Sequence, residues 1–278
     1  MTEGTLKRGY VIDSRDVESL QDKGDTVATR RTIGAAHGSL RLEQRVLRVA
    51  TGRSQPREHD GYEEILYVVE GTGTLLVDRA PHALEPGTAA YVAPGQRSEI
   101  ESAGPGELVL VSVLYPEPDE GPRDPDLPVI VRYDDQPAHR AGKDREFRHL
   151  VDTRGVTQFV GSIPPGRARD HYHLYEEVAY ILEGEGILHM DGLENTTFHP
   201  GTCILFTPPV PHCVENTGTS VVRVLGVFYP PGSPADAYNV PDEPGERGGA
   251  DEEQARAARR AREYKRSRGR RQAKEASE

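Results

Sequence analysis

The stretch "RDHYHLYEEVAYILEGEG" (residues 169–186) carries two histidines two residues apart, followed closely by two adjacent glutamates. On an extended strand side chains alternate between faces, so His171 and His173 point the same way and Tyr172 points away. After a short turn Glu177 opens an apolar strand on the face of Ala179 and Ile181, whereas Glu176 is expected to be exposed. The spacing predicts two imidazoles and one carboxylate that face a common space.

A third histidine completes a set of side chains that could bind a metal. His212, in "PPVPHCVEN", follows two proline-rich turns and begins another short strand. Three imidazoles and one carboxylate suit Fe(II), Mn(II), Ni(II), Cu(II) or Zn(II) far better than Mg²⁺ or Ca²⁺. The alternative, ordinary surface or hydrogen-bonded histidines, would require four coincidences of spacing. We therefore predict one divalent transition metal, preferably Fe(II) or Mn(II), on His171, His173, Glu177 and His212.

The elements that position these residues occur twice in the chain. "EEILYVVEGTG" (63–73) aligns with "EEVAYILEGEG" (176–186), and "LEPGTAAYVAPGQRSEIES" (84–102) aligns with "FHPGTCILFTPPVPHCVEN" (198–216). Each copy then continues into an apolar run that ends in Tyr-Pro. Aligned blocks in the same order indicate an internal duplication.

The aligned blocks read as short strands rich in Val, Ile, Leu and Tyr, separated by turns. The chain has 29 glycines and 22 prolines, which favours an all-β protein over a helical bundle. Evenly spaced short strands predict a sandwich or small barrel in each half. We expect an N-terminal arm (1–34), a first barrel (35–116), a linker (117–146), a second barrel (147–230), and a linker with a charged tail (231–278).

Composition limits the classes of partner. The net charge of −11 argues against nucleic acid as the main partner, and no apolar run is long enough for a signal peptide or a membrane span. Two cysteines make no disulfide framework, so we expect a soluble, cytoplasmic protein. The tail at 251–278 is expected to be a short solvated helix or a disordered segment; the alternative is a basic arm that binds RNA or an acidic surface of its own oligomer.

Both halves resemble the cupin superfamily, and the whole chain resembles a bicupin. The two cupin motifs fall in the second half on Gly166, His171, His173, Glu177 and Gly184, and then on Gly201, Pro208, His212 and Asn216. The resemblance implies two double-stranded β-helix barrels of the jelly-roll type, each with six to eight strands, and a metal inside the second. Bicupins pack their barrels face to face, which implies a compact pseudo-dimer and leaves room for a homodimer.

The first half departs from the cupin ligand set. Only His59 and Glu64 match, whereas Arg57 replaces the first histidine and Ser98 the last. A guanidinium beside two ligands would repel a divalent cation, so we predict a metal-free first barrel. We expect Arg57 to pair with Glu64 and fill the position; the alternative is a pocket that holds an anionic ligand.

The resemblance implies an enzyme, because metal-bearing bicupins include oxygenases and oxalate-type decarboxylases. We expect a dioxygenase-type oxidoreductase acting on a small organic acid, phenolic or polyketide-like metabolite, with Glu177 doubling as a proton shuttle. Alternatives are a non-redox cyclase, isomerase, decarboxylase or hydrolase at the same site, or a metal-containing binding protein without turnover. Gln158 is expected to offer its amide to the substrate, and Ala179 and Ile181 to line the apolar wall.

Overall fold

The computed structural model describes residues 9–102, 104, 106–116, 127–141 and 145–239. Within these residues the elements are strands joined by turns and four short 3-10 helices. This agrees with the all-β expectation, whereas the charged tail at 251–278 lies outside the described residues. No helix in the described part is long and apolar enough to cross a membrane.

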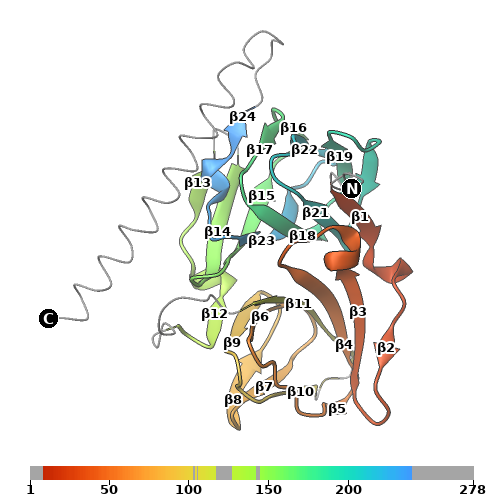
Figure 1. The fold of residues 1–278 in the computed structure, drawn as a ribbon, viewed down its shortest axis with the longest axis vertical. Helices are drawn as coiled ribbons and strands as arrows, with labels where there is room; N and C mark the ends of the chain where they lie inside the picture. The colour runs from red at the N-terminus through yellow and green to blue at the C-terminus, as the bar shows by residue number, and fades with distance from the viewer. Residues whose placement is uncertain (1–8, 103, 105, 117–126, 142–144, 240–278) are drawn as a thin grey trace, which may run out of the picture.

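Two barrels are stacked on one another, the first orange to yellow and the second green to blue in Figure 1. The large sheet of the first barrel contains β2 (Leu20–Gln21), β3 (Val27–Ile33), β4 (Glu43–Val49), β6 (Tyr62–Glu70), β9 (Thr88–Val92), β11 (Leu108–Pro116) and β12 (Ile130–Arg132). Its small sheet contains β5 (Gly52–Arg53), β7 (Gly73–Val77), β8 (Ala80–Leu84) and β10 (Ser98–Ser102).

The second barrel repeats this plan. Its large sheet contains β1 (Tyr10–Asp13), β13 (His139–Ala141), β14 (Arg145–Asp152), β15 (Thr157–Ile163), β18 (Glu176–Glu183), β21 (Thr202–Phe206) and β23 (Val222–Tyr229). Its small sheet contains β16 (Gly166–Arg167), β17 (His171–Tyr172), β19 (Gly186–Met190), β20 (Thr196–Phe198), β22 (His212–Asn216) and β24 (Tyr238–Asn239).

The two large sheets are buried on both faces. On β18, Val178 and Tyr180 belong to one apolar cluster that includes residues of both barrels, whereas Ala179 and Ile181 pack inside the second barrel. β6 alternates in the same way between this shared cluster and the interior of the first barrel. Burial on both faces explains why these strands read as nearly continuous apolar runs.

The segments expected as an arm and a linker contribute strands to the barrels. β1 pairs with β21 in the second barrel, although β3, which follows shortly after it, belongs to the first. Conversely β12, from the segment that joins the halves, pairs with β9 of the first barrel. The boundaries expected at residues 35 and 147 are therefore not where the sheets divide, because each added strand pairs an otherwise open sheet edge.

Glu176 is buried, with 2% of its surface exposed, contrary to the expectation from sequence. Its carboxylate accepts hydrogen bonds from Ser39 Oγ (2.8 Å) and from the backbone N–H groups of Leu40 (2.5 Å), Arg41 (3.3 Å) and Leu42 (3.0 Å). These donors lie between β3 and β4 of the first barrel. The expectation was wrong because the face of β18 that points away from the barrel interior is covered by the other barrel.

The corresponding residue of the first barrel, Glu63, is buried at the same interface. It accepts a hydrogen bond from Tyr91 Oη (2.8 Å). Close by, Tyr115 Oη lies 3.0 Å from Thr153 Oγ1 of the second barrel. Burial, with the nearby Glu63 carboxylate, raises the pKa of Tyr115 well above its usual value, so the phenol stays protonated as a donor. Each barrel thus presents a buried carboxylate to the interface.

We predict that Glu176→Ala lowers the free energy of unfolding by about 2–4 kcal/mol, because three backbone N–H groups and a hydroxyl lose their buried acceptor. Urea unfolding followed by circular dichroism measures the change. The matched control is Glu185→Ala, at an exposed position shortly after the same strand. An equal effect of both substitutions would contradict this role for Glu176.

Candidate metal centre

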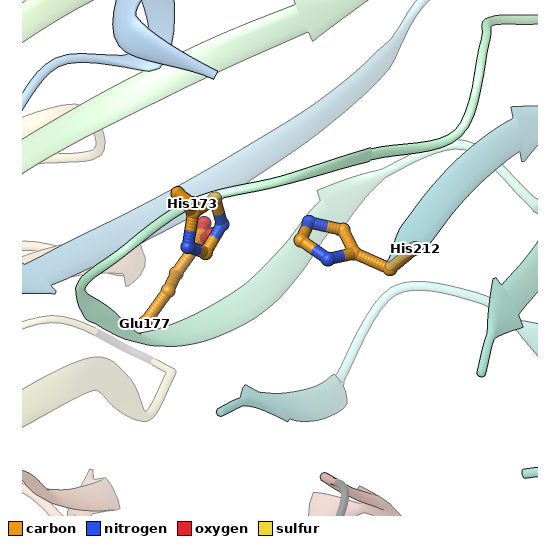
Figure 2. A group of neighbouring side chains, drawn as sticks. All are labelled: His173, Glu177 and His212. Atoms are coloured by element: carbon orange, nitrogen blue, oxygen red, sulfur yellow. The ribbon is translucent and has the colours of Figure 1, made fainter. Parts of the chain in front are cut away.

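Three of the four predicted ligands converge inside the second barrel. His173 precedes β18, Glu177 lies on β18 and His212 begins β22; their ligand atoms are all within 4.8 Å of one another and all three residues are buried. Figure 2 shows the imidazole of His212 extending from its own strand toward His173 and Glu177. The barrel therefore joins ligands that are almost 40 residues apart in the chain.

The contact between His173 and Glu177 fits two ligands of one ion. Nε2 of His173 lies 2.9 Å from Oε2 of Glu177, yet this buried nitrogen has no hydrogen-bond partner because the geometry is unsuitable. Neighbouring ligands of an octahedral ion with bonds of about 2.1 Å are themselves about 3 Å apart. The nitrogen and oxygen donors suit a divalent transition metal.

His171 lies beside this group rather than within it. It is directly opposite His212 in the β17–β22 pair, and the two ring centroids are 4.5 Å apart. The distance from the ring of His171 to that of His173 is 6.4 Å. The structure thus brings three predicted ligands together and places the fourth against one of them.

Backbone carbonyls hold all three imidazoles in one tautomer. Nδ1 of His173 lies 3.0 Å from the carbonyl of Tyr175, Nδ1 of His212 lies 2.9 Å from that of Val210, and Nδ1 of His171 lies 3.4 Å from that of Arg169. A carbonyl only accepts, so each Nδ1–H donates and each Nε2 keeps its lone pair. This is the arrangement that orients histidine ligands in metal sites.

Burial keeps two of these imidazoles neutral. It lowers the pKa of His171 to about 4, helped by the nearby charge of Arg145 and by His173. It also lowers the pKa of His212 well below its usual value, with further lowering from His173 and His171. Metals bind the neutral form of imidazole, so the site does not have to lose protons from these two residues near pH 7.

Arg145 is a residue of the site that the sequence did not reveal, because it lies in the segment expected as a linker. It begins β14, and its Nη2 is buried and has no hydrogen-bond partner within the described part of the chain. Burial lowers the pKa of its guanidinium, whereas Cys213 and Glu177 nearby raise it. A half-buried cation whose Nη2 atom is buried therefore lies beside the candidate ligands. The only sequence feature that could have indicated it is the alternation of side chains along a strand. Arg145 precedes Phe147 by two residues, so the two side chains lie on the same face.

Aromatic rings pack around the centre. Phe147, Phe159 and Phe228 form one buried cluster, against which Tyr175 packs. The ring of Tyr175 stacks on His173 at 4.7 Å, and its hydroxyl donates to the carbonyl of Ser233 (2.7 Å). The strand β24, which follows Ser233, pairs with β17 at His171. The segment that follows β23, the last strand of the large sheet, therefore folds back to pair with the strand that carries His171.

Gln158 lies away from the candidate centre. It is opposite Val227 in the β15–β23 pair, and Val227 packs in the cluster between the barrels. Its neighbour Phe159 takes the inner face instead, against Gly226. The expected contact between the Gln158 amide and a substrate is therefore not supported, since alternation places that amide on the interface side. Ala179 and Ile181 do lie in the interior cluster.

A glycine opposite the ligand strand gives the Glu177 carboxylate its room. A Cβ on Gly226 would lie 2.8 Å from Glu177 Oε1 and 2.3 Å from the ring of Phe159. The repeat places Ser112 at this position in the first barrel, and its hydroxyl donates to Glu64 Oε1 at 2.5 Å. The carboxylate is thus tied by a hydroxyl in one barrel and left free of that contact in the other.

The first barrel differs from the expectation at Arg57. An isolated bridge joins Arg57 to Ser98, as β17 and β22 join His171 to His212, so the guanidinium occupies the equivalent position. Among the described residues Arg57 makes no ion pair with Glu64, which instead contacts Ser112 and lies 3.7 Å from His59 Nε2. The predicted pair is therefore wrong: the hydrogen-bond partner of the Glu64 carboxylate is the hydroxyl of Ser112.

A family model described as "Cupin domain" matches residues 45–114 and 159–228, one match in each barrel and together half of the chain. The chain belongs to the cupin family. With one match in each half, it is a bicupin.

Solved structures of similar fold cover most of the bicupin, and one relative in sequence covers a third of it. Ylba from E. coli superposes with a TM-score of 0.68 at 14% identity, covering 81% of this chain and 92% of that one. A mutant of Bacillus subtilis oxalate decarboxylase OxdC gives a TM-score of 0.63 at 14% identity, covering 82% and 78%. The uncharacterized protein MJ1618 of Methanocaldococcus jannaschii is 34% identical over 96 residues, which are 33% of this chain and 76% of that protein.

We predict that His212→Ala removes the metal from the bicupin. Loss of a direct ligand should weaken binding by more than about 100-fold, since loss of a residue that merely orients a ligand already costs about 10- to 100-fold. Metal content is measured by elemental analysis after purification with each candidate ion. His59→Ala, which changes the counterpart of His173 in the first barrel, is the control and should leave the content unchanged. Equal loss in both variants would contradict a centre confined to the second barrel.

A second prediction concerns Gly226. Gly226→Ala should weaken metal binding by about tenfold or more, because the added Cβ pushes the Glu177 carboxylate from its position. Titration of the metal-stripped protein measures the affinity, and the unfolding midpoint separates this effect from loss of stability. Ser112→Gly makes the reciprocal change in the first barrel and should leave the affinity unaltered.

Proposed function

We propose that this bicupin is a metal-dependent enzyme whose active site lies in the second barrel, and that it oxidises a small organic acid or phenolic compound with dioxygen. The observation that carries the proposal is the convergence of His173, Glu177 and His212 beside a half-buried arginine. His173, Glu177 and His212 would fit a metal equally well without Arg145. The arginine adds a reason for an anionic substrate to bind there.

The residues present would hold Fe(II) or Mn(II) on His173, Glu177 and His212, with His171 as the fourth ligand. Such an ion supplies a Lewis acid and an electron-transfer partner for dioxygen. The chain itself keeps the imidazoles of His171 and His212 neutral and orients all three imidazoles through backbone carbonyls. Glu177, whose Oε1 faces Gly226, is the carboxylate able to accept and return a proton at the reacting atoms.

The charge and the apolar wall of the site together define the substrate class. Nη2 of Arg145 is a buried donor without a partner, which a carboxylate or phenolate oxygen would satisfy. The rings of Phe147, Phe159 and Phe228 offer contact to a planar or apolar body. Ala179 and Ile181 belong to the apolar cluster further along the interior. These features support a small acid with an organic skeleton.

A non-redox reaction at the same site is the second candidate. The observation that favours it is the position of Glu177 Oε1, free of the hydroxyl contact that fixes Glu64 in the first barrel. A carboxylate that can move a proton serves decarboxylation, isomerisation or hydrolysis without electron transfer.

The homodimer and the cytoplasmic location expected from the sequence stay predictions.

Oxygen uptake tests the function directly. The purified, metal-loaded protein is assayed with a panel of small aliphatic and aromatic acids, with and without dioxygen. We expect dioxygen to be consumed in proportion to product, and no turnover in His212→Ala. Product formed at equal rates without dioxygen would support the non-redox candidate. Turnover that persists in the metal-stripped protein would exclude both, and binding without turnover would indicate a binding protein.

For any substrate found in this way, Arg145→Gln should lower kcat/KM by about 10- to 100-fold, because a buried charge-assisted hydrogen bond to the acid is lost. Arg145→Lys should recover part of the loss, since it restores the charge without the planar fork. Arg140→Gln, at an exposed position on the preceding strand, is the control. An unchanged kcat/KM in Arg145→Gln would contradict its role in binding the acid.

A further inference from the structure

The first barrel contains a polar cluster at the position where the second holds its candidate metal ligands. Arg57, His59 and Glu64 occupy the places of His171, His173 and Glu177 in the repeat. The bridge between Arg57 and Ser98 reproduces the pairing of His171 with His212. The two clusters are therefore equivalent in position and different in chemistry.

Several atoms of this cluster are buried and have no hydrogen-bond partner among the residues that the structure describes. They are Nε and Nη2 of Arg57, Nε2 of His59 and Oε2 of Glu64. Glu64 itself is only 1% exposed, and its other oxygen is fixed by Ser112. Nε2 of His59 and Oε2 of Glu64 lie 3.7 Å apart, too far for a hydrogen bond. Leaving buried charged atoms without a hydrogen bond is expensive, so this cluster suits a bound molecule that supplies the missing hydrogen bonds.

The donors of Arg57 identify one part of this molecule. Nε–H and one N–H of Nη2 point along the same edge of a guanidinium, and this edge receives both oxygens of a carboxylate in a bidentate pair. Arg53 uses the same edge on the outer surface of the barrel, where Nε and Nη2 both donate to one oxygen, Oε2 of Glu101. On Arg57 the edge is buried and unpaired, so it fits a ligand carboxylate.

Glu64 identifies the other part. A carboxylate oxygen only accepts, so Oε2 requires a donor, and a cationic donor compensates its charge best in a buried place. A metal ion does not fit, because a cationic residue, Arg57, holds the strand position of the ligand His171, and Ser98 holds that of His212. An ammonium group on the same small molecule meets both conditions.

We propose that the first barrel binds a small α-amino acid as its zwitterion, with the ligand carboxylate on Arg57 and its ammonium on Glu64. The cluster carries one positive and one negative side chain, so a zwitterion matches both charges and leaves the buried site neutral. Ser98 has a shorter side chain than His212, which holds this position in the second barrel, and the side chain of His59 is 22% exposed. This site is independent of the reaction proposed for the second barrel.

Three probes test the assignment: alanine, lactate, which has the same number of heavy atoms, and the smaller ethylamine. Lactate replaces the ammonium with a hydroxyl, and ethylamine lacks the carboxylate. Binding to the full-length, metal-stripped protein is measured by calorimetry. We expect one alanine per chain, and binding of lactate and of ethylamine about tenfold weaker or more, because each leaves one buried charge without its partner.

Variants locate the binding. Arg57→Gln and Glu64→Gln should each weaken alanine binding by about tenfold or more, whereas His212→Ala, in the other barrel, should leave it unchanged. Circular dichroism and the unfolding midpoint verify that each variant is folded. If Glu64→Gln does not fold, the wild-type probe series and Arg57→Gln decide the question.

Three results would overturn the proposal. The first is the absence of saturable alanine binding to the wild-type protein. The second is lactate or ethylamine binding as tightly as alanine, which would remove the need for both charges. The third is alanine binding that His212→Ala abolishes and Arg57→Gln does not affect, which would place the ligand in the second barrel.

Discussion

The alternation of side chains along a strand buried on both faces is the constraint on which the bicupin depends. In β18 it sends two adjacent glutamates in opposite directions, Glu177 into the barrel and Glu176 into the other barrel. β6 does the same with Glu64 and Glu63. Because neither face of these strands meets water, each carboxylate needs partners supplied by other elements. On each of these strands, one pair of adjacent glutamates thus links the interior of a barrel to the interface between the barrels.

The duplicated scaffold shows how few substitutions separate the two interiors. The bridge between the ligand strands, the central strand and the glycine-bounded turns occur in both copies. The chemistry differs because Arg57 and Ser98 replace two imidazoles, and because Ser112 replaces the glycine that leaves Glu177 its room. A hydroxyl in hydrogen-bonding distance fixes one carboxylate, and its absence leaves the other to bind a cation.

Burial has a double role in the candidate metal centre. It removes the imidazoles from water, which favours their neutral form, and the carbonyls of the ligand loops then fix which nitrogen carries the proton. The same burial leaves Nη2 of Arg145 without a hydrogen-bond partner among the described residues. Ligands that are neutral and oriented in advance reduce the reorganisation that metal binding would require.

The sequence by itself determined the duplication, the all-β class, the cupin family and the candidate ligand group, because strand periodicity and ligand type are local properties. Only the tertiary structure decided what covers each strand. It buried Glu176 against the first barrel, turned Gln158 away from the centre and brought Arg145 to it from a segment read as a linker. It also separated Arg57 from Glu64. Alternation along a strand says which residues share a face, but the packing of one sheet on another decides whether that face meets solvent, a ligand or the second barrel.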